Sequence, residues 1–364
     1  SKYLSLMLGS TVQAQTVVLA VFMGGLALGN RLIGARADLL ARPLSAYGYL
    51  EVTIGLYAFC FSAIFSLADK VFIGLGSKLF ENSLGMLLLK SGLSVGLLLL
   101  PTVLMGGTLP ILSKYLVASQ NELGKKIGNL YFINTLGAAF GTILTGFILI
   151  FLMGTQFTTL TAAIINLSIA VSAFLVARAV KWSPASESGV ENLESRVSST
   201  GVPPVQGSEA TGSTSANPRS LSAPAHIIIL VGYGLAGFAA LGLEVQWTKV
   251  LTMMIGTSVY AFSLMLSSFL TGIALGSFFM AKFVDRRKDL WRDFAIIEIL
   301  LGISILVLNP LLGILPGLFA NIFQNYKEIF WILQTLEFVV IFLIMLVPTL
   351  LMGAAFPVVS KIYA

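Results

Sequence analysis

Cysteine and histidine are almost absent from this sequence of 364 residues. Cys60 is the only cysteine and lies in an apolar run, so an internal disulfide, a CxxC motif and a thiolate metal site are excluded. His226 is the only histidine, and its place at an expected helix start is more typical of an interfacial residue than of a ligand. We therefore expect no metal site, no histidine-dependent catalytic triad and no cofactor.

Charged residues are also scarce, at 10% of the chain, whereas hydrophobic residues make up 57% and the mean hydropathy is +0.93. These values exclude an ordinary soluble domain. The net charge of +6 comes from basic residues dispersed among loops, so nucleic acid is not an expected partner. The composition predicts an all-α, polytopic membrane protein whose first partner is the lipid bilayer.

The apolar runs that remain are long enough, at roughly 20 residues, to cross a bilayer as helices. They predict nine helices, at Ser10–Gly34, Tyr47–Leu67, Leu87–Val117, Ile127–Met153, Thr158–Val180, His226–Val245, Val259–Phe283, Phe294–Leu315 and Ile329–Tyr363.

The sequence repeats itself. PTVLMGGTLPILSK at Pro101–Lys114 and PTLLMGAAFPVVSK at Pro348–Lys361 share eight of fourteen residues at an offset of 247 (348 minus 101). The same offset, without a gap, pairs Gly9 with Gly256, Gly25 with Gly272, Gly29 with Gly276, Asp38 with Asp285, Glu51 with Glu298 and Gly55 with Gly302. A register kept over this length indicates a duplicated bundle.

A stretch rich in Ser, Pro, Gly, Thr and Glu, from Ser183 to Ala225, separates the two copies and cannot bury an apolar core. We therefore predict a first membrane half-bundle at 1–182, a disordered linker at 183–225 and a second half-bundle at 226–364. The offset predicts truncation at both ends, with helices 2–6 of the first six-helix repeat and helices 1–4 of the second present. Six helices per repeat make the two repeats parallel.

Basic residues predict the topology. If the loop after the first predicted helix is cytoplasmic, fourteen Lys and Arg residues outside the linker fall on the inside and six on the outside. This bias is typical of a plasma membrane protein, and it predicts a multi-pass protein of the bacterial inner membrane with a cytoplasmic linker.

Three segments carry a family resemblance. They are GLEVQWTKVLTMMIGTSVYAFSLMLSSFLTGIALGS at Gly242–Ser277, the paired PTxLMGxxxP segments, and GNLYFINTLGAAFGTILTGF at Gly128–Phe147. With the charged loop GSFFMAKFVDRRKD, they resemble the major facilitator superfamily and, more closely, the membrane region of fused major-facilitator and spermidine synthase-like proteins. The resemblance implies two six-helix bundles around a central site. In that family an aminopropyltransferase-type domain often follows the helices, but this segment contains no catalytic motif.

Ionisable residues inside apolar segments are the first candidates for function. Lys90 and Glu337 are 247 apart, so they occupy equivalent positions with opposite charge. They could form a gate or a substrate-coupled pair across the cavity, or each could extend to the membrane interface. Glu244 could bind a cationic group or be an interfacial carboxylate. Glu51 and Glu298 are predicted to form structural ion pairs with the cytoplasmic basic loops.

Four prolines break the paired helices at Pro101, Pro110, Pro348 and Pro357, and each frees a carbonyl that needs a new partner in lipid. Thr102 and Thr349 are placed to supply it, and these breaks fit either a binding site or a simple kink.

Small residues form two further patterns. Asn134 lies on a small-residue face with Gly137 and Gly141, which favours helix packing over solute binding. The pairs Gly25/Gly29 and Gly272/Gly276 are packing motifs.

These features favour a translocator or receptor for a small-molecule solute, with carboxylates that suit an organic cation such as a polyamine. One alternative is the membrane anchor of a spermidine synthase-like enzyme, with a fused or associated cytoplasmic catalytic domain. Another is a scaffold subunit of a larger membrane complex.

Overall fold

The computed structural model describes residues 12–37, 39–79, 82–116, 123–180, 223–255 and 259–362. Regular structure in these ranges is helical, which confirms the all-α prediction. The main helices are α2 (Val12–Ala37), α3 (Pro43–Leu79), α4 (Ser83–Leu116), α5 (Leu123–Ile143), α6 (Ile150–Ala179), α8 (Ala223–Ile255), α9 (Val259–Phe283), α10 (Leu290–Leu311), α11 (Leu315–Tyr326) and α12 (Phe330–Ile362). A π-helical segment, η2 (Leu144–Leu149), joins α5 to α6, and a short 3₁₀ turn, η3 (Val284–Arg286), follows α9. The predicted linker lies outside the described residues, except that α8 begins at Ala223.

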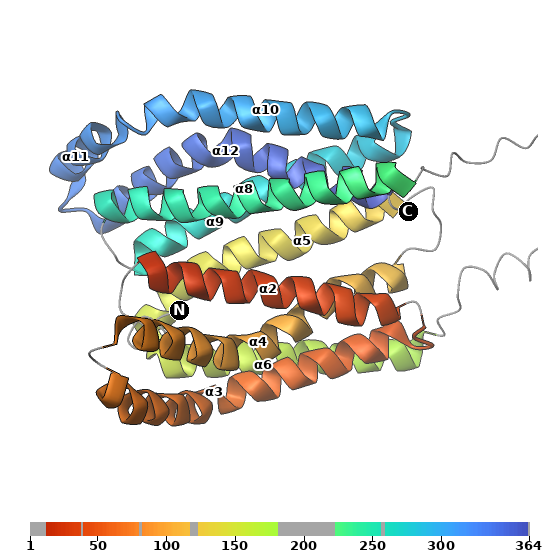
Figure 1. Ribbon diagram of the computed structural model, residues 1–364, viewed down its shortest axis with the longest axis horizontal. Helices are drawn as coiled ribbons and strands as arrows, with labels where there is room; N and C mark the ends of the chain where they lie inside the picture. Colours follow the sequence, from red (N-terminus) through yellow and green to blue (C-terminus); the bar gives the residue numbers. More distant parts are fainter. Residues whose placement is uncertain are drawn as a thin grey trace, which may run out of the picture.

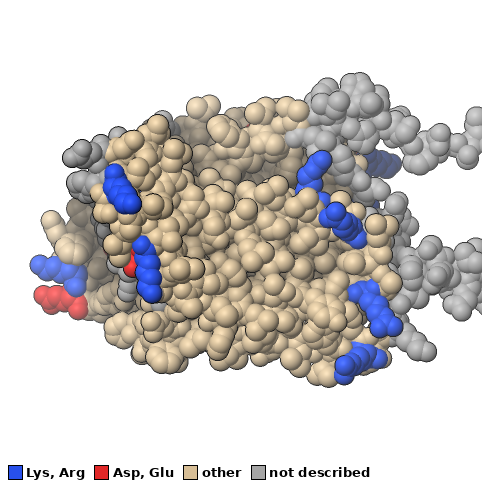
Figure 2. Space-filling view, turned by 60° about the horizontal axis from the view of Figure 1, so that its bottom comes forward, with Lys and Arg blue, Asp and Glu red and all other residues tan. Residues whose placement is uncertain are grey.

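The helices lie side by side along the long axis of one bundle (Figure 1). Six helical segments of the described chain are long and apolar enough to cross a membrane. The outer surface is apolar as well, with Phe238 79% and Leu306 75% exposed. Figure 2 shows Lys and Arg side chains gathered at the two ends, with a belt free of charged residues between them. This architecture is compatible with a multi-pass membrane protein.

The first half contains the one described glycine with a positive φ. Gly154 (φ 71°) kinks the helical path that runs through α5, η2 and α6. Glycine accepts this backbone conformation because it has no Cβ. The break falls in the gap between the predicted helices Ile127–Met153 and Thr158–Val180.

The second half contains a short helix that the sequence analysis did not predict. In the first half, α3 runs unbroken to Leu79, well past its predicted end at Leu67. In the second half, the stretch equivalent to α3 is divided into α10, a turn and α11. The offset aligns Pro310, Gly313 and Pro316 with Ala63, Ser66 and Asp69. The Gly313 N–H donates to the Pro310 carbonyl at 3.2 Å, and Pro316 lies in the first turn of α11. Prolines favour helix starts and oppose helix continuation, so these three residues explain the division.

Two helix pairs repeat one packing arrangement. α2 packs against α4, and α9 packs against α12. A Cβ placed on Gly25 would overlap the Thr102 hydroxyl, and a Cβ placed on Gly272 would overlap the Thr349 hydroxyl. Each glycine is 247 residues from its counterpart, as is each threonine. The glycines therefore allow close helix approach, as the sequence analysis expected.

The interface between residues 1–182 and 226–364 runs along α5, which packs against α9 and α12 (Figure 1). The Tyr131 and Phe356 rings stack with centroids 4.2 Å apart. The Ser277 hydroxyl donates to the Gly128 carbonyl at 3.1 Å. One helix of the first half thus carries most of the contact with the second.

Candidate functional site

Two carboxylates are buried in the apolar second half, on different helices. Glu337 on α12 is 5% exposed and Glu244 on α8 is 3% exposed. The ion pairs between described residues join Lys361 to Asp285 and Arg287 to Asp293, so neither glutamate takes part in one. Burying a carboxylate without a cation is unfavourable, which marks both positions as candidate binding groups.

Glu337 has a neutral hydrogen-bond partner on the same helix face. Gln334 Nε2 donates to Glu337 Oε2 at 2.9 Å, across the i, i+3 spacing that brings helical side chains together. Gln334 is itself only 9% exposed, and its Oε1 atom is buried without a hydrogen-bond partner in the described chain. The sequence analysis missed Gln334. Its signal was a polar residue three positions before Glu337, where the first half has Leu87.

Glu244 has an unsatisfied carboxylate atom. Its Oε2 is buried and has no hydrogen-bond partner among the described residues. The nearby Thr248 hydroxyl donates instead to the Glu244 backbone carbonyl at 2.7 Å. The carboxylate oxygen is thus an acceptor available to a donor that the described chain does not supply.

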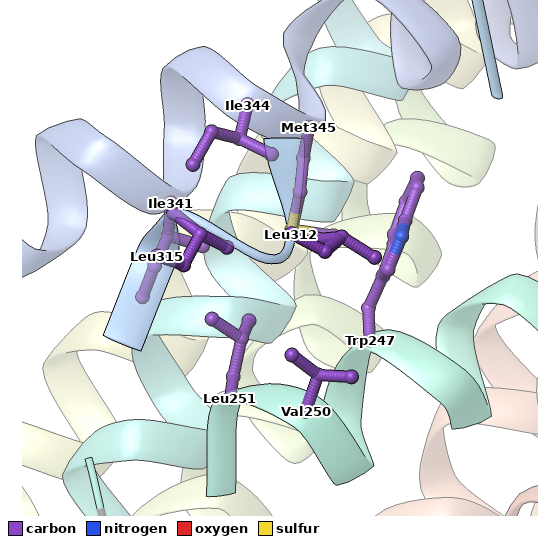
Figure 3. Close-up of a pocket in the computed structure, with 8 residues that line it drawn as sticks. All are labelled: Trp247, Val250, Leu251, Leu312, Leu315, Ile341, Ile344 and Met345. Carbon is purple, nitrogen blue, oxygen red and sulfur yellow. The ribbon is translucent and has the colours of Figure 1, made fainter. Parts of the chain in front are cut away.

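An apolar cavity is lined by residues that follow the two carboxylates by about one helical turn. Its walls come from α8, α12 and the region where α10 gives way to α11 (Figure 3), and its lining residues are Trp247, Val250, Leu251, Leu312, Leu315, Ile341, Ile344 and Met345. Glu244 precedes Trp247 by one turn, and Glu337 precedes Ile341 by one turn. The two helices, α8 and α12, run in opposite directions (Figure 1).

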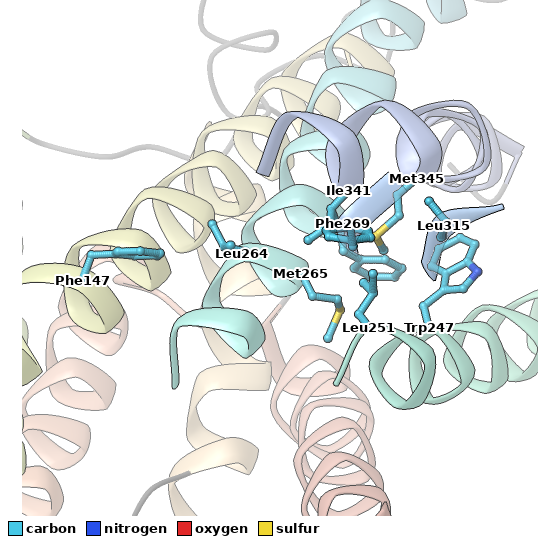
Figure 4. Packing of buried hydrophobic residues seen from close by; sticks show 10 residues of the cluster. Phe147, Trp247, Leu251, Leu264, Met265, Phe269, Leu315, Ile341 and Met345 are labelled. Carbon is cyan, nitrogen blue, oxygen red and sulfur yellow. The ribbon is translucent and has the colours of Figure 1, made fainter. Parts of the chain in front are cut away.

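The cavity is small, at about 10 Å³, which is close to the space that one water molecule needs. Binding any larger solute would require the lining helices to separate. Trp247, Met265 and Phe269 belong to the buried cluster around it (Figure 4), with the Trp247 and Phe269 rings 6.5 Å apart. These apolar surroundings exclude water and would strengthen any charge interaction at the glutamates.

Lys90 and Glu337 form no ion pair with each other among the described residues. Lys90 is half-buried on α4. The predicted charge-pair gate therefore stays a prediction. Glu337 has Gln334 as its hydrogen-bond partner instead.

The proline-broken segments stay helical, with Pro101 and Pro110 inside α4 and Pro348 and Pro357 inside α12. Pro101 cannot donate to the Leu97 carbonyl, four residues earlier. The Tyr57 hydroxyl donates to that carbonyl at 2.8 Å.

The hydroxyl groups of Thr102 and Thr349 do not hydrogen-bond to the carbonyls that the prolines leave free. The Thr102 hydroxyl bonds to Leu98 at 2.7 Å and the Thr349 hydroxyl to Met345 at 2.7 Å. The expectation that they serve the proline-freed carbonyls is therefore corrected. Both threonines are buried against glycines of the neighbouring helix, which is a packing position.

Asn134 is exposed on α5. A Cβ placed on Gly137 or Gly141 would meet no atom within 4 Å. The predicted packing of this small-residue face therefore finds no partner within the part of the chain that the structure describes.

Glu51 and Glu298 lie near tyrosines. Glu51 is buried and interacts with Tyr47, one turn earlier on α3. Glu298 is half-buried near Tyr233 of α8, and its Oε1 atom lacks a hydrogen-bond partner in the described chain. Their predicted ion pairs with the basic loops stay predictions.

A loop carboxylate that the site prediction did not include connects the two halves. Asp285 Oδ1 pairs with Lys361 Nζ at 3.0 Å, and Asp285 Oδ2 accepts the backbone N–H of Lys125 at 2.9 Å. Lys125 lies in the first turn of α5, where carboxylates cap unpaired N–H groups and favour the helix dipole. We call these three residues the Asp285 bridge. Its sequence signal was the duplication of Asp38 as Asp285.

No group of three or more His, Cys, Asp or Glu side chains suited to hold a metal is found among the described residues. No protein-family model, curated protein or solved structure matches the chain.

Proposed function

We propose that the chain is a polytopic inner-membrane protein with a facilitator-like fold that binds and translocates a small organic cation, with polyamines among the candidates. One observation carries the proposal. Glu337 and Glu244 are buried, make no ion pair with a described basic residue, and lie about one helical turn before residues that line an apolar cavity. A cation of the solute would supply the missing charge partner.

The proposed fold consists of two parallel pseudo-repeats with a cytoplasmic linker. The 247-residue register supports it, and so do the matching contacts of Gly25 with Thr102 and of Gly272 with Thr349. Symmetry-related halves around a shared site are the general design of such transporters.

Transport in this proposal combines rocking of the halves along α5 with a movement of helices inside the second half. The cavity is too small for a solute larger than water, so α8 and α12 must separate from each other to admit one. The Asp285 bridge holds α5 against the ends of α9 and α12. On the predicted topology it closes the cytoplasmic side and must open during release.

Uptake of radiolabelled alkylamines into proteoliposomes tests the proposal. Glu337→Gln and Glu244→Gln should each remove most of the uptake, because each substitution deletes a buried negative charge. Glu328→Gln is the matched control, since Glu328 is exposed just before α12. Full uptake by both buried-site variants would remove these glutamates from the mechanism.

A further inference from the structure

Gln334 and Glu337 form an acceptor pair that exists in only one half of the molecule. At the offset of 247, the first half has Leu87 and Lys90 at these positions. The duplicated Gly–Thr contacts show which features both halves need for packing. The first half packs in the same way without the Gln334–Glu337 pair. The packing that the two halves share therefore does not require this pair.

The hydrogen bond fixes the orientation of the Gln334 amide. An ionised carboxylate can only accept, so the amide nitrogen must face Glu337, as the 2.9 Å contact from Nε2 to Oε2 shows. The amide oxygen is then turned to another side. That oxygen is buried and accepts no hydrogen bond from the described chain, in a residue only 9% exposed.

We infer that Gln334 and Glu337 together select cations that carry N–H donors, namely protonated primary or secondary amines and guanidinium groups, over quaternary ammonium ions. The inference rests on the proposed cation-binding function and deepens it. Glu337 supplies the charge complement for any cation. Gln334 Oε1 needs a hydrogen-bond donor, which a quaternary ammonium ion lacks.

The expected selectivity follows from the unpaired acceptor. A quaternary ammonium ion would leave the Gln334 oxygen buried without a partner and would place methyl groups against it. Sites built to hydrogen-bond a ligand strongly reject analogues without the donor. A hydrogen bond to a charged donor corresponds to roughly ten- to hundredfold in affinity.

Isothermal titration calorimetry on the purified full chain tests this with pentylammonium and N,N,N-trimethylpentylammonium, which have the same alkyl chain. The wild-type protein should bind pentylammonium at least about tenfold more tightly. Gln334→Leu, which installs the residue found at position 87, should reduce the preference because Glu337 is then the only acceptor of the pair. Gln334→Asn keeps an amide that can both donate and accept, and it should retain more of the preference than Gln334→Leu, which controls for a variant that folds poorly.

The outcomes separate this inference from the proposed function. Equal binding of both probes by the wild-type protein would overturn the N–H selectivity and leave cation binding intact. A preference unchanged in Gln334→Leu would overturn the role of Gln334. Binding of neither probe would overturn both the inference and the proposed function.

Discussion

Asp285 accepts a hydrogen bond from the backbone N–H of Lys125 at 2.9 Å, although the two residues are 160 positions apart and lie in different halves of the molecule. The same carboxylate pairs with Lys361 at the end of α12. One side chain thus links the beginning of α5 to the ends of α9 and α12. Any relative movement of the halves at this end has to break the contact between Asp285 and Lys125.

Asp285→Asn should therefore loosen the interface at this end. The variant loses the ion pair with Lys361 and weakens the cap on α5, which together correspond to about 1–2 kcal/mol. The rate of maleimide labelling of Ser277→Cys, in a Cys60→Ser background, reports exposure between α5 and α9. We expect faster labelling with Asp285→Asn and no change with Asp289→Asn in the same loop. Equal rates in all three proteins would show that the bridge does not hold the interface.

Gly272→Ala should destabilise the α9–α12 pair because the new methyl group would overlap the Thr349 hydroxyl. Overpacking of this kind costs about 1–3 kcal/mol. Gly137→Ala is the control, since its methyl group would meet no atom within 4 Å and alanine favours helices. The measurement is the midpoint of thermal unfolding in one detergent, and equal midpoints for the two variants would contradict the close packing.

Tyr57→Phe should leave the Leu97 carbonyl without its side-chain donor. A buried acceptor left unpaired costs about 1–3 kcal/mol. Tyr49→Phe serves as the control because Tyr49 is 67% exposed. The measurement is the midpoint of thermal unfolding. A lower midpoint for Tyr57→Phe alone would support the role of Tyr57 at the Pro101 kink, whereas equal midpoints for the two variants would contradict that role.

The triple substitution Pro310→Ala, Gly313→Ser and Pro316→Asp should join α10 and α11 into one helix like α3. Leu312 and Leu315 would then leave the cavity wall. Maleimide labelling of Leu251→Cys, again in the Cys60→Ser background, should become faster as the cavity opens. Unchanged labelling would mean that the turn does not close the cavity.

The sequence predicted the helical class, most helix positions and the packing glycines, because apolar run length and a 247-residue register are local and directly readable. It did not predict α11, whose existence depends on three residues, Pro310, Gly313 and Pro316, inside one apolar run. A search for long apolar segments cannot separate a turn and a short helix from the longer helix before them.

The candidate site was only partly readable from the sequence. Glu244 and Glu337 were identified because ionisable residues are rare in apolar segments. Gln334 was missed because a neutral amide gives no such signal, and its role depends on the hydrogen bond to Glu337. The partners of Tyr57 and Asp285 depend on packing between helices, which the offset alone does not specify.

The most direct test of the proposed function is the affinity of the purified protein for pentylammonium, measured by calorimetry in the wild type, Glu337→Gln and Glu328→Gln. Glu337→Gln should weaken binding at least about tenfold, because a buried charge partner is removed. Glu328→Gln should bind like the wild type. Wild-type affinity in Glu337→Gln would contradict the assignment of the buried α12 carboxylate as the cation site.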